Sequence, residues 1–166
     1  MPVTDVTKDL DALTMTITAE FDAGAERVWE MWSDPRQLER WWGPPSFPAT
    51  FVDHDLAAGG RVTYFMTGPE GERFHGYWDV LDCEPPRRLV VHDGFLSDDG
   101  TPNDDLPRTL MAVGIADRPG GVVVTIMSTF ASAEAMETLL QMGMEEGLLL
   151  AIGQIDDILA GSAAPA

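Results

Sequence analysis

A single histidine falls where a strand pattern would place it on the apolar side of a sheet. His54 alternates with Val52 and Leu56, whereas Asp53 and Asp55 fall on the opposite side of the same segment. An imidazole enclosed by apolar side chains can orient a ligand or transfer a proton near neutral pH. The alternative is a histidine whose ring is satisfied by a local hydrogen bond and has no chemical role. His54 is therefore a candidate acid or base.

Other chemistry is limited by the residue types present. His75 and His92 are expected at the surface or at strand ends, and the three histidines share no short metal-binding spacing. Cys83 is the single cysteine, which excludes an internal disulfide and a site with several cysteine ligands. The sequence has no phosphate-binding loop, dinucleotide fingerprint, nucleophile elbow or helical HExxH motif. We therefore expect no metal ion and no cofactor.

The composition narrows the classes of partner. The chain of 166 residues is 45% apolar, enough for a buried core, and has a formal net charge of −18. Nucleic acid and anionic membrane surfaces both require clustered Lys and Arg, so we expect neither as a partner. No apolar run approaches the ~20 residues of a membrane-spanning helix, and residues 1–11 do not resemble a signal peptide. These features predict a cytoplasmic protein whose acidity serves solubility.

The elements that would position these residues begin with a strand and two helices. Residues 13–21 alternate apolar side chains with polar ones, which is typical of a half-buried strand. Val28 and Trp32 then share a helical face. Asp34-Pro35 ends that helix and begins a second short one, because a residue before proline avoids the α region and aspartate can cap the next helix.

The rest of the chain is predicted to form strands and then one long helix. Turns rich in glycine and proline separate the strands, which favours antiparallel pairing. The expected strands are 48–57, 60–67, 73–82, 88–95, 109–116 and 121–130. Residues 133–160 keep a helical spacing of apolar side chains after an N-cap at Ser132, and at 1.5 Å per residue this helix is about 42 Å long. The predicted fold is α+β, an antiparallel sheet covered by its C-terminal helix.

Many separate landmarks occur in an order that matches a known family. They are AERVWEMWSDP at 25–35, WWGP at 41–44, GPEG at 68–71, PPRRL at 85–89 and MGMEEG at 142–147. In this order they resemble a bacterial branch of the START-like (SRPBCC) superfamily, similar to the C-terminal domain of the heat-shock-protein-90 ATPase activator.

The resemblance extends over about residues 13–160 and implies a helix-grip fold. In that fold a curved antiparallel sheet wraps around the long C-terminal helix, and the space between them is often a ligand cavity. The chain is accordingly expected to be one domain over residues 1–166, with a flexible tail at 161–166. The separate N-terminal domain by which the eukaryotic co-chaperone contacts its chaperone has no counterpart here, so a chaperone contact is not expected.

Alternation within the strands indicates which side chains would face such a cavity, since the larger apolar ones are expected inside. From the sheet these are His54, Tyr64, Met66, Trp78, Met111, Val113, Val124 and Ile126. One of Trp41 and Trp42 is expected at the mouth, with Trp42 as the candidate, and Leu140 and Met144 are expected on the helix side. A stripe of small residues that includes Gly143 and Gly147 indicates either a close approach of the helix to the sheet or a void between them.

Three functions are compatible with this arrangement. The leading hypothesis is binding of a small hydrophobic or amphipathic molecule, because small-molecule sites are mostly apolar with a few polar anchors. The second is a cyclase- or hydrolase-like enzyme that uses the same cavity, with His54 as acid or base and Tyr64 as a hydrogen-bond donor. The third is an interaction module for a chaperone or for a second copy of the chain, as in a homodimer, which requires an exposed apolar patch.

Overall fold

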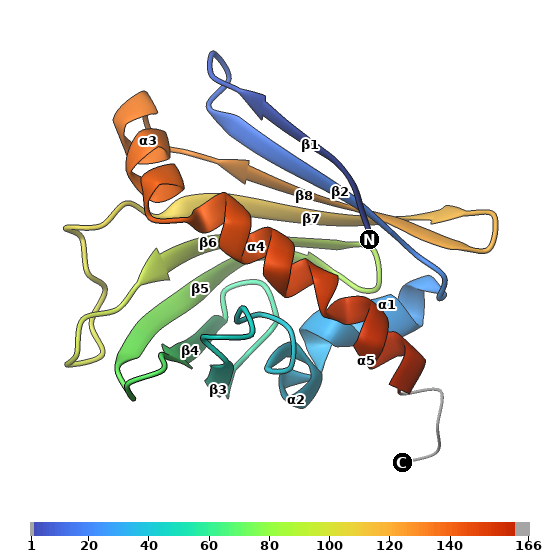
Figure 1. Ribbon diagram of the computed structural model, residues 1–166, viewed down its shortest axis with the longest axis horizontal. Coiled ribbons are helices and arrows are strands. Elements are labelled where there is room, and N and C mark those ends of the chain that lie inside the picture. Colours follow the sequence, from blue (N-terminus) through green and yellow to red (C-terminus); the bar gives the residue numbers. More distant parts are fainter. Residues whose placement is uncertain (1, 162–166) are drawn as a thin grey trace.

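The computed structural model describes residues 2–161 as a single antiparallel sheet with helices against one face (Figure 1). The strands are β1 (Val3–Asp9), β2 (Thr14–Phe21), β3 (Ala49–His54), β4 (Arg61–Thr67), β5 (Arg73–Glu84), β6 (Arg88–Phe95), β7 (Thr109–Arg118) and β8 (Gly121–Thr129). The helices are α1 (Ala25–Ser33), α2 (Pro35–Leu38), α3 (Ala133–Gln141), α4 (Met144–Gly153) and α5 (Ile155–Gly161). The strand order across the sheet is β1-β2-β8-β7-β6-β5-β4-β3.

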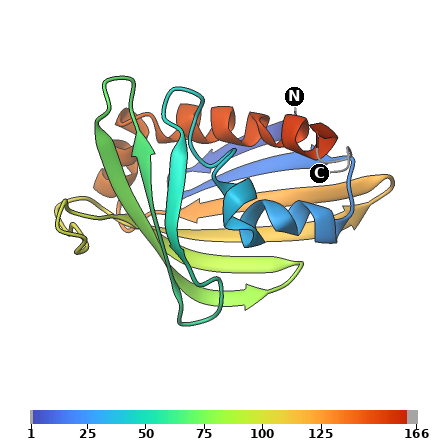
Figure 2. The same ribbon diagram turned by 90° about the horizontal axis from the view of Figure 1, so that it is seen from below.

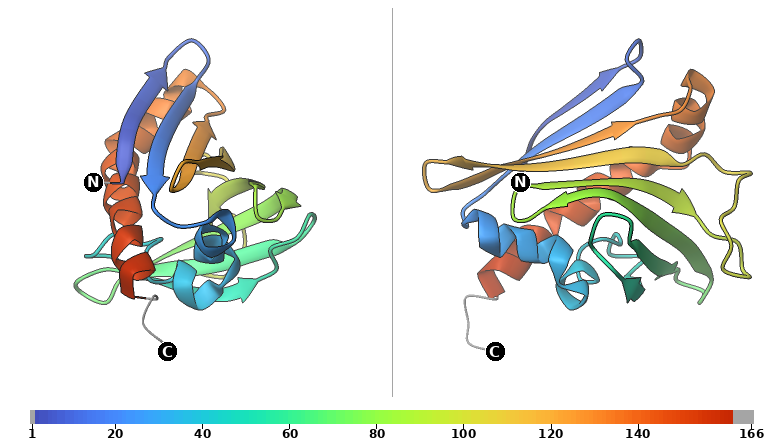
Figure 3. Two further views of the ribbon diagram at one scale, coloured as in Figure 1. Left: turned by 90° about the vertical axis from the view of Figure 1, so that its right-hand side faces the viewer. Right: turned by 180° about the vertical axis from the view of Figure 1, so that it is seen from behind.

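The sheet curves around the C-terminal helices. Figure 2 shows α4 and α5 running across the concave face, with β3, β4 and β5 bending around one side of them. Figure 3 shows α1 and α2 at one end of the same face, close to α5. The core lies between these helices and the strands, because each element has one apolar side that must be covered. The arrangement confirms the predicted α+β helix-grip fold.

The alternation that predicts an inward face holds along the central strands. In β8, Val122, Val124 and Ile126 are at most 2% exposed, whereas Met127 between them and the strand end is 40% exposed. The pairing of β2 with β8 places Ile17 opposite Ile126. Apolar side chains of neighbouring strands therefore meet on one face and bury each other.

One edge strand, β1, has no clear sequence signal and is absent from the predicted element order. It pairs antiparallel with β2 at the edge of the sheet. Its two apolar side chains that pack against the core, Val3 and Val6, are three residues apart, because the register shifts between Val3 and Asp5. The register shift therefore interrupts the alternation of apolar and polar side chains by which a strand is recognised in the sequence.

The single helix predicted over residues 133–160 is wrong in one respect, because three shorter helices take its place. Gly143 separates α3 from α4 and has a φ of 89°, in the left-handed region that glycine adopts at little cost. Ser132 caps α3 as predicted, since its hydroxyl accepts a hydrogen bond from the Ala135 N–H at 3.0 Å. The predicted flexible tail lies, at 162–166, outside the described residues.

We expect Gly143→Ala to lower the free energy of unfolding by about 1 kcal/mol, because alanine must then adopt a positive φ. A Cβ at this position meets no atom within 4 Å, so the cost is conformational and not steric. Gly153→Ala is the matched control: its Cβ also meets nothing, and its φ lies outside the left-handed region. We expect that change to stabilise α4 by up to about 1 kcal/mol. Urea unfolding measures both values, and effects of the same sign would contradict the prediction.

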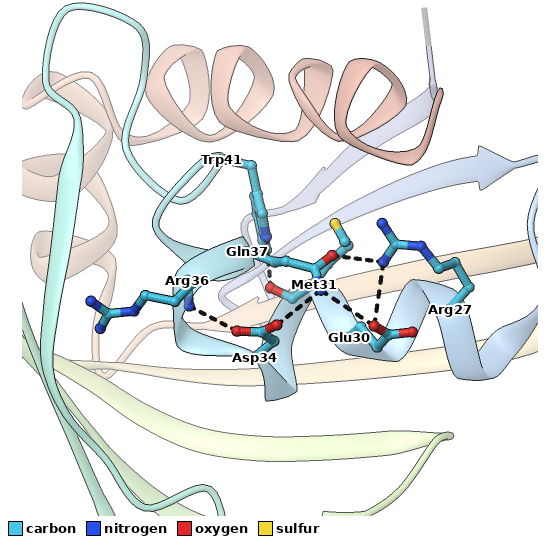
Figure 4. Close-up of polar contacts among 7 residues, drawn as sticks. All are labelled: Arg27, Glu30, Met31, Asp34, Arg36, Gln37 and Trp41. Carbon is cyan, nitrogen blue, oxygen red and sulfur yellow. Dashed lines mark hydrogen bonds and ion pairs between the residues drawn. The ribbon is translucent and has the colours of Figure 1, made fainter. Parts of the chain in front are cut away.

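Polar contacts fix the corner between α1 and α2 (Figure 4). Asp34 caps α2, since its carboxylate accepts a hydrogen bond from the Arg36 N–H at 3.0 Å. The Gln37 amide donates to the same carboxylate, also at 3.0 Å. Beyond the corner, the Trp41 indole N–H donates to the Met31 carbonyl at 2.8 Å. The predicted change of helix at Asp34 is confirmed, and the corner directs the tryptophans that follow it into the core.

A row of tryptophans connects this corner to the middle of the sheet. Trp32 and Trp41 contact each other edge to face with ring centroids 5.0 Å apart, and Trp41 contacts Trp42 at 5.5 Å. Trp42 in turn lies 4.9 Å from the ring of Trp78 on β5. Such contacts add to the stabilisation that the buried ring area provides. Among residues 2–161, none of the helices combines the length and the apolar character needed to cross a membrane.

Candidate ligand-binding site

A cavity of about 270 Å³ lies between the concave face of the sheet and the junction of α3 with α4. Strands β4, β6, β7 and β8 form its floor, and the two helices form its roof. The apolar floor residues are Met66, Phe95 and Met111. The apolar roof residues are Leu139, Met142, Met144 and Leu148. Most of the lining is therefore apolar, as in sites that bind small organic molecules.

The small residues of the roof explain why the space stays open. Gly143 and Gly147 both border the cavity, and neither has a side chain to fill it. A Cβ at Gly147 would meet its nearest neighbour, the Pro44 ring, at an ordinary contact distance of 3.7 Å. Of the two interpretations of this stripe, the structure favours a void over a close approach of helix and sheet.

Four polar side chains on the floor face the same space. Thr109 and Ser128 are 4% and 1% exposed. The Tyr64 hydroxyl donates a hydrogen bond to Oδ1 of Asp93 at 3.0 Å. Strand pairing places Asp93 opposite Thr109, so the acid and its polar neighbours form one group on the floor. The cavity therefore has an apolar part and a polar part.

Gly76 allows this hydrogen bond to cross the sheet. Tyr64 extends from β4 and Asp93 from β6, so the tyrosine ring must pass over β5. Gly76 is paired with Tyr64 at that point, and a Cβ there would lie only 2.5 Å from Cζ of the ring. The absence of a side chain at Gly76 is thus a requirement for the position of the Tyr64 hydroxyl.

Burial dominates the electrostatics of the pair. It raises the pKa of Asp93 from 3.8 to about 7, and the hydrogen bond from Tyr64 offsets only part of that increase. Burial also raises the pKa of Tyr64 well above its usual value, and the charge of Asp93 adds to this effect. The Asp93 carboxyl can therefore hold or release a proton near neutral pH, or pair with a cation.

Trp42 forms an aromatic wall of the cavity. Its ring contacts that of Tyr64 edge to face at 6.1 Å, and only 6% of the residue is exposed. The Gln154 amide fixes the loop that carries it, because it donates to the carbonyls of Trp41 at 3.2 Å and Gly43 at 2.8 Å. The Trp42 N–H makes no hydrogen bond within residues 2–161.

The chain has clear relatives among known proteins. Residues 22–160 match the family described as "Activator of Hsp90 ATPase homolog 1-like protein". The chain belongs to this family. With it the chain belongs to the START-like superfamily, whose fold is that of ligand-binding domains in general. No curated protein matches the chain.

Solved structures agree with the family assignment. A crystal structure of a protein from Mycobacterium smegmatis is 53% identical, with a TM-score of 0.88, and the match covers 95% of this chain and 97% of that one. A solution structure of a protein from Arthrobacter aurescens is 47% identical, with a TM-score of 0.92, over 99% and 94% of the two chains. A member of the family from Silicibacter pomeroyi is 20% identical, with a TM-score of 0.72 over 90% and 99%, and shares the fold.

In this member of the family, the structure brings together only part of the lining that the sequence predicts. Trp42, Tyr64, Met66, Met111 and Met144 border the cavity. Trp78, Val113, Val124 and Ile126 are buried in the core beside it and are at most 2% exposed. Apolar side chains of α4 and α5 fill that part of the concave face. Leu140 borders a separate depression next to α3, together with Leu10 and Leu13.

His54 does not border the cavity, which corrects its proposed role as acid or base there. Its Nε2 lies 2.9 Å from the carbonyl oxygen of Trp32, so the ring is satisfied by a local hydrogen bond. A bulge in β3 between Phe51 and Asp53 shifts the alternation of the strand. Phe51 is consequently 3% exposed and Val52 65% exposed, so the inward position predicted for Val52 is wrong. An enzyme that uses His54 in the cavity has no geometric basis.

Asp93 is the main site residue that the predicted lining omits. In β6, Leu89 and Val91 are fully buried, and the same alternation leads to Asp93 and Phe95. The sequence therefore contains a signal for this site, which is an acidic side chain on the apolar face of a strand. An aspartate is rarely buried in a protein unless it has a partner. The inward faces predicted from the sequence do not include one for residues 88–95, so Asp93 is missing from the predicted lining.

Proposed function

We propose that this chain binds a small hydrophobic or amphipathic molecule in the cavity below the junction of α3 and α4. The observation that carries the proposal is the division of the lining: most of it is apolar, and the polar side chains gather around Asp93 and Tyr64. A ligand with an apolar body and one polar group is complementary to such a surface. The general association of the START-like fold with ligand binding supports the same function.

The dimensions of the cavity favour a small ligand. Its volume of about 270 Å³ lies just below the range of roughly 300–1,000 Å³ that is typical of ligand pockets. Met66, Met111, Met142 and Met144 all contribute to the lining, and methionine adapts to ligands of irregular shape. Met142 is also 54% exposed, so the lining reaches the protein surface beside the helix junction. We therefore expect the cavity, in the conformation described, to hold small ligands of different apolar shapes.

Gly147→Leu tests the proposal, because it fills the cavity from the roof. The glycine borders the cavity and has room for a Cβ, and leucine is the better helix former by roughly 1 kcal/mol. We therefore expect the variant to fold. We also expect it to bind the neutral apolar dye N-phenyl-1-naphthylamine at least ~10-fold more weakly than the wild type, a loss of about 1.4 kcal/mol in binding. Fluorescence titration of the dye measures both affinities.

Gly153→Leu is the matched control, since it makes the same change in the same helix away from the cavity. It should bind the dye with the affinity of the wild type. Equal dye affinity in the wild type and in Gly147→Leu would refute the cavity as the binding site. Native mass spectrometry of the purified protein, repeated after denaturation, would show the chemical class of any ligand that it retains.

A further inference from the structure

The cavity acid, Asp93, has no basic partner within residues 2–161. Among residues 2–161, no Lys, Arg or His borders the cavity, and the side chain that hydrogen-bonds to Asp93 is the neutral phenol of Tyr64. The Arg108 guanidinium pairs with Asp79 and not with Asp93, with 3.9 Å between Nη1 of Arg108 and Oδ2 of Asp79. The part of the chain that the structure describes therefore supplies no counter-charge for this carboxylate inside the cavity.

Each element that packs around Asp93 presents a neutral group to it. β5 places Trp78 opposite it, and β7 places Thr109 opposite it on the other side. β4 contributes Tyr64, the other titratable side chain that borders the cavity within residues 2–161. The cavity-facing residues of α3 and α4 are apolar or glycine. His92, the next residue before Asp93, belongs to the opposite face of β6, where burial lowers its pKa.

A carboxylate in an apolar cavity is costly unless a proton or a cation neutralises it. A proton does so only up to about pH 7, which is the pKa of Asp93. Above that pH, an ammonium group on a ligand would supply the missing cation and form a charge-assisted hydrogen bond. The rings of Trp42 and Tyr64 border the same space, and aromatic rings attract cations. The net charge of −18 also raises the local concentration of cationic ligands around the protein.

We infer that the ligand is an apolar molecule with one protonated amine, whose ammonium group pairs with Asp93 while its apolar part lies against the methionines of the cavity. This inference rests on the function proposed above and narrows its ligand class. Only the ionised carboxylate pairs with a cation. Binding of such an amine therefore strengthens as the pH rises through about 7, whereas binding of a neutral analogue does not.

Octylamine, octanol and octanoate test the inference, because they share one apolar chain and differ in charge. Each is titrated against N-phenyl-1-naphthylamine bound to the wild-type protein. At about pH 8 we expect octylamine to bind at least ~10-fold more tightly than octanol, and octanoate to bind most weakly. At about pH 6 the carboxyl is mostly protonated, and the preference for the amine should fall below about 3-fold. Octylamine itself stays protonated over this range, as a lysine amine does with a pKa of ~10.4.

Asp93→Asn separates the cavity acid from the overall charge of the protein. The variant keeps the size of the side chain and an oxygen that accepts from Tyr64, and it should bind octylamine no better than octanol at about pH 8. Asp98→Asn removes the same charge from an exposed position in the β6–β7 loop and should keep the preference of the wild type. A preference that survives Asp93→Asn would overturn the inference, since the surface charge would then be its source.

The outcomes distinguish this inference from the function on which it rests. If the dye and octanol bind but octylamine has no advantage at about pH 8, the inference fails and the proposed binding function stands. If neither the dye nor any octyl compound binds the wild type, both fail. If octylamine is preferred and the preference depends on both pH and Asp93, both are supported.

Discussion

Trp41→Ala is expected to lower the free energy of unfolding by about 3–5 kcal/mol, a large part of the stability of an ordinary domain. Trp41 is fully buried and contacts Trp32 and Trp42 edge to face. Its N–H also donates to the Met31 carbonyl, in the last turn of α1, where a helix leaves carbonyls without partners (Figure 4). Alanine would leave both a void and an unpaired buried carbonyl.

Urea unfolding followed by circular dichroism measures this loss. Phe74→Ala is the control, because it also truncates an aromatic side chain but at a position that is 53% exposed. We expect the control to cost less than about 1 kcal/mol, as substitutions at exposed positions usually do. A loss of the same small size for Trp41→Ala would contradict the role assigned to the row of tryptophans.

Asp93→Asn is expected to stabilise the protein at alkaline pH, relative to the wild type. Burial raises the pKa of Asp93 from 3.8 to about 7 in the folded state. The shift of about three units corresponds to at most ~4 kcal/mol, at ~1.4 kcal/mol for each unit. Because Asp93 is only partly buried and borders the cavity, solvent reduces this value. We therefore expect the advantage of the variant to grow by about 1–3 kcal/mol between about pH 5 and pH 8.

The sign of this effect follows from which state holds the proton. Between pH 3.8 and about 7 the folded Asp93 is protonated, while the same group in the unfolded chain is ionised. The folded state therefore binds more protons, and its stability falls as the pH rises through that window. Above about pH 7 both states are ionised and the loss is complete. Asparagine has no proton to lose, so its contribution does not change with pH.

The measurement is a series of urea unfolding curves for the two proteins from about pH 5 to pH 8. The series begins above the isoelectric point of about 4.2, so that the protein keeps its charge. Asp98→Asn, in the exposed β6–β7 loop, should follow the wild type throughout. A difference between Asp93→Asn and the wild type that stays constant with pH, or that shrinks as the pH rises, would contradict the prediction.

The fold could be predicted from the sequence wherever the backbone is regular. Six strands between residues 48 and 130 and the corner at Asp34 were predicted, because a period of two and a proline signal report local geometry directly. The bulge in β3 and the register shift in β1 are set by pairing with another strand. The neighbours in sequence do not show these irregularities, so the sequence pattern predicts the wrong side for Val52.

The cavity could be predicted only in part, because it depends on where the helix leaves the sheet. The alternation of β4 and β7 predicts that Tyr64, Met66 and Met111 face the helices, and all three border the cavity. It does not show that α4 and α5 fill the space beside Val124 and leave a void near Gly143. One domain, a cytoplasmic location, a possible homodimer and the lack of nucleic-acid or chaperone partners stay predictions of the sequence.

Because the helix is broken at Gly143, the roof of the cavity can move more easily than its floor. The floor belongs to a sheet whose strands are cross-linked by hydrogen bonds on both sides. The roof is made of two short helices, α3 and α4, joined by Met142 and by Gly143 in the left-handed conformation. A change in the φ and ψ angles of this glycine alone would reorient one helix relative to the other. A ligand that needs more space would therefore displace a helix before a strand. The position of the acid would stay constant while the apolar volume above it adjusts.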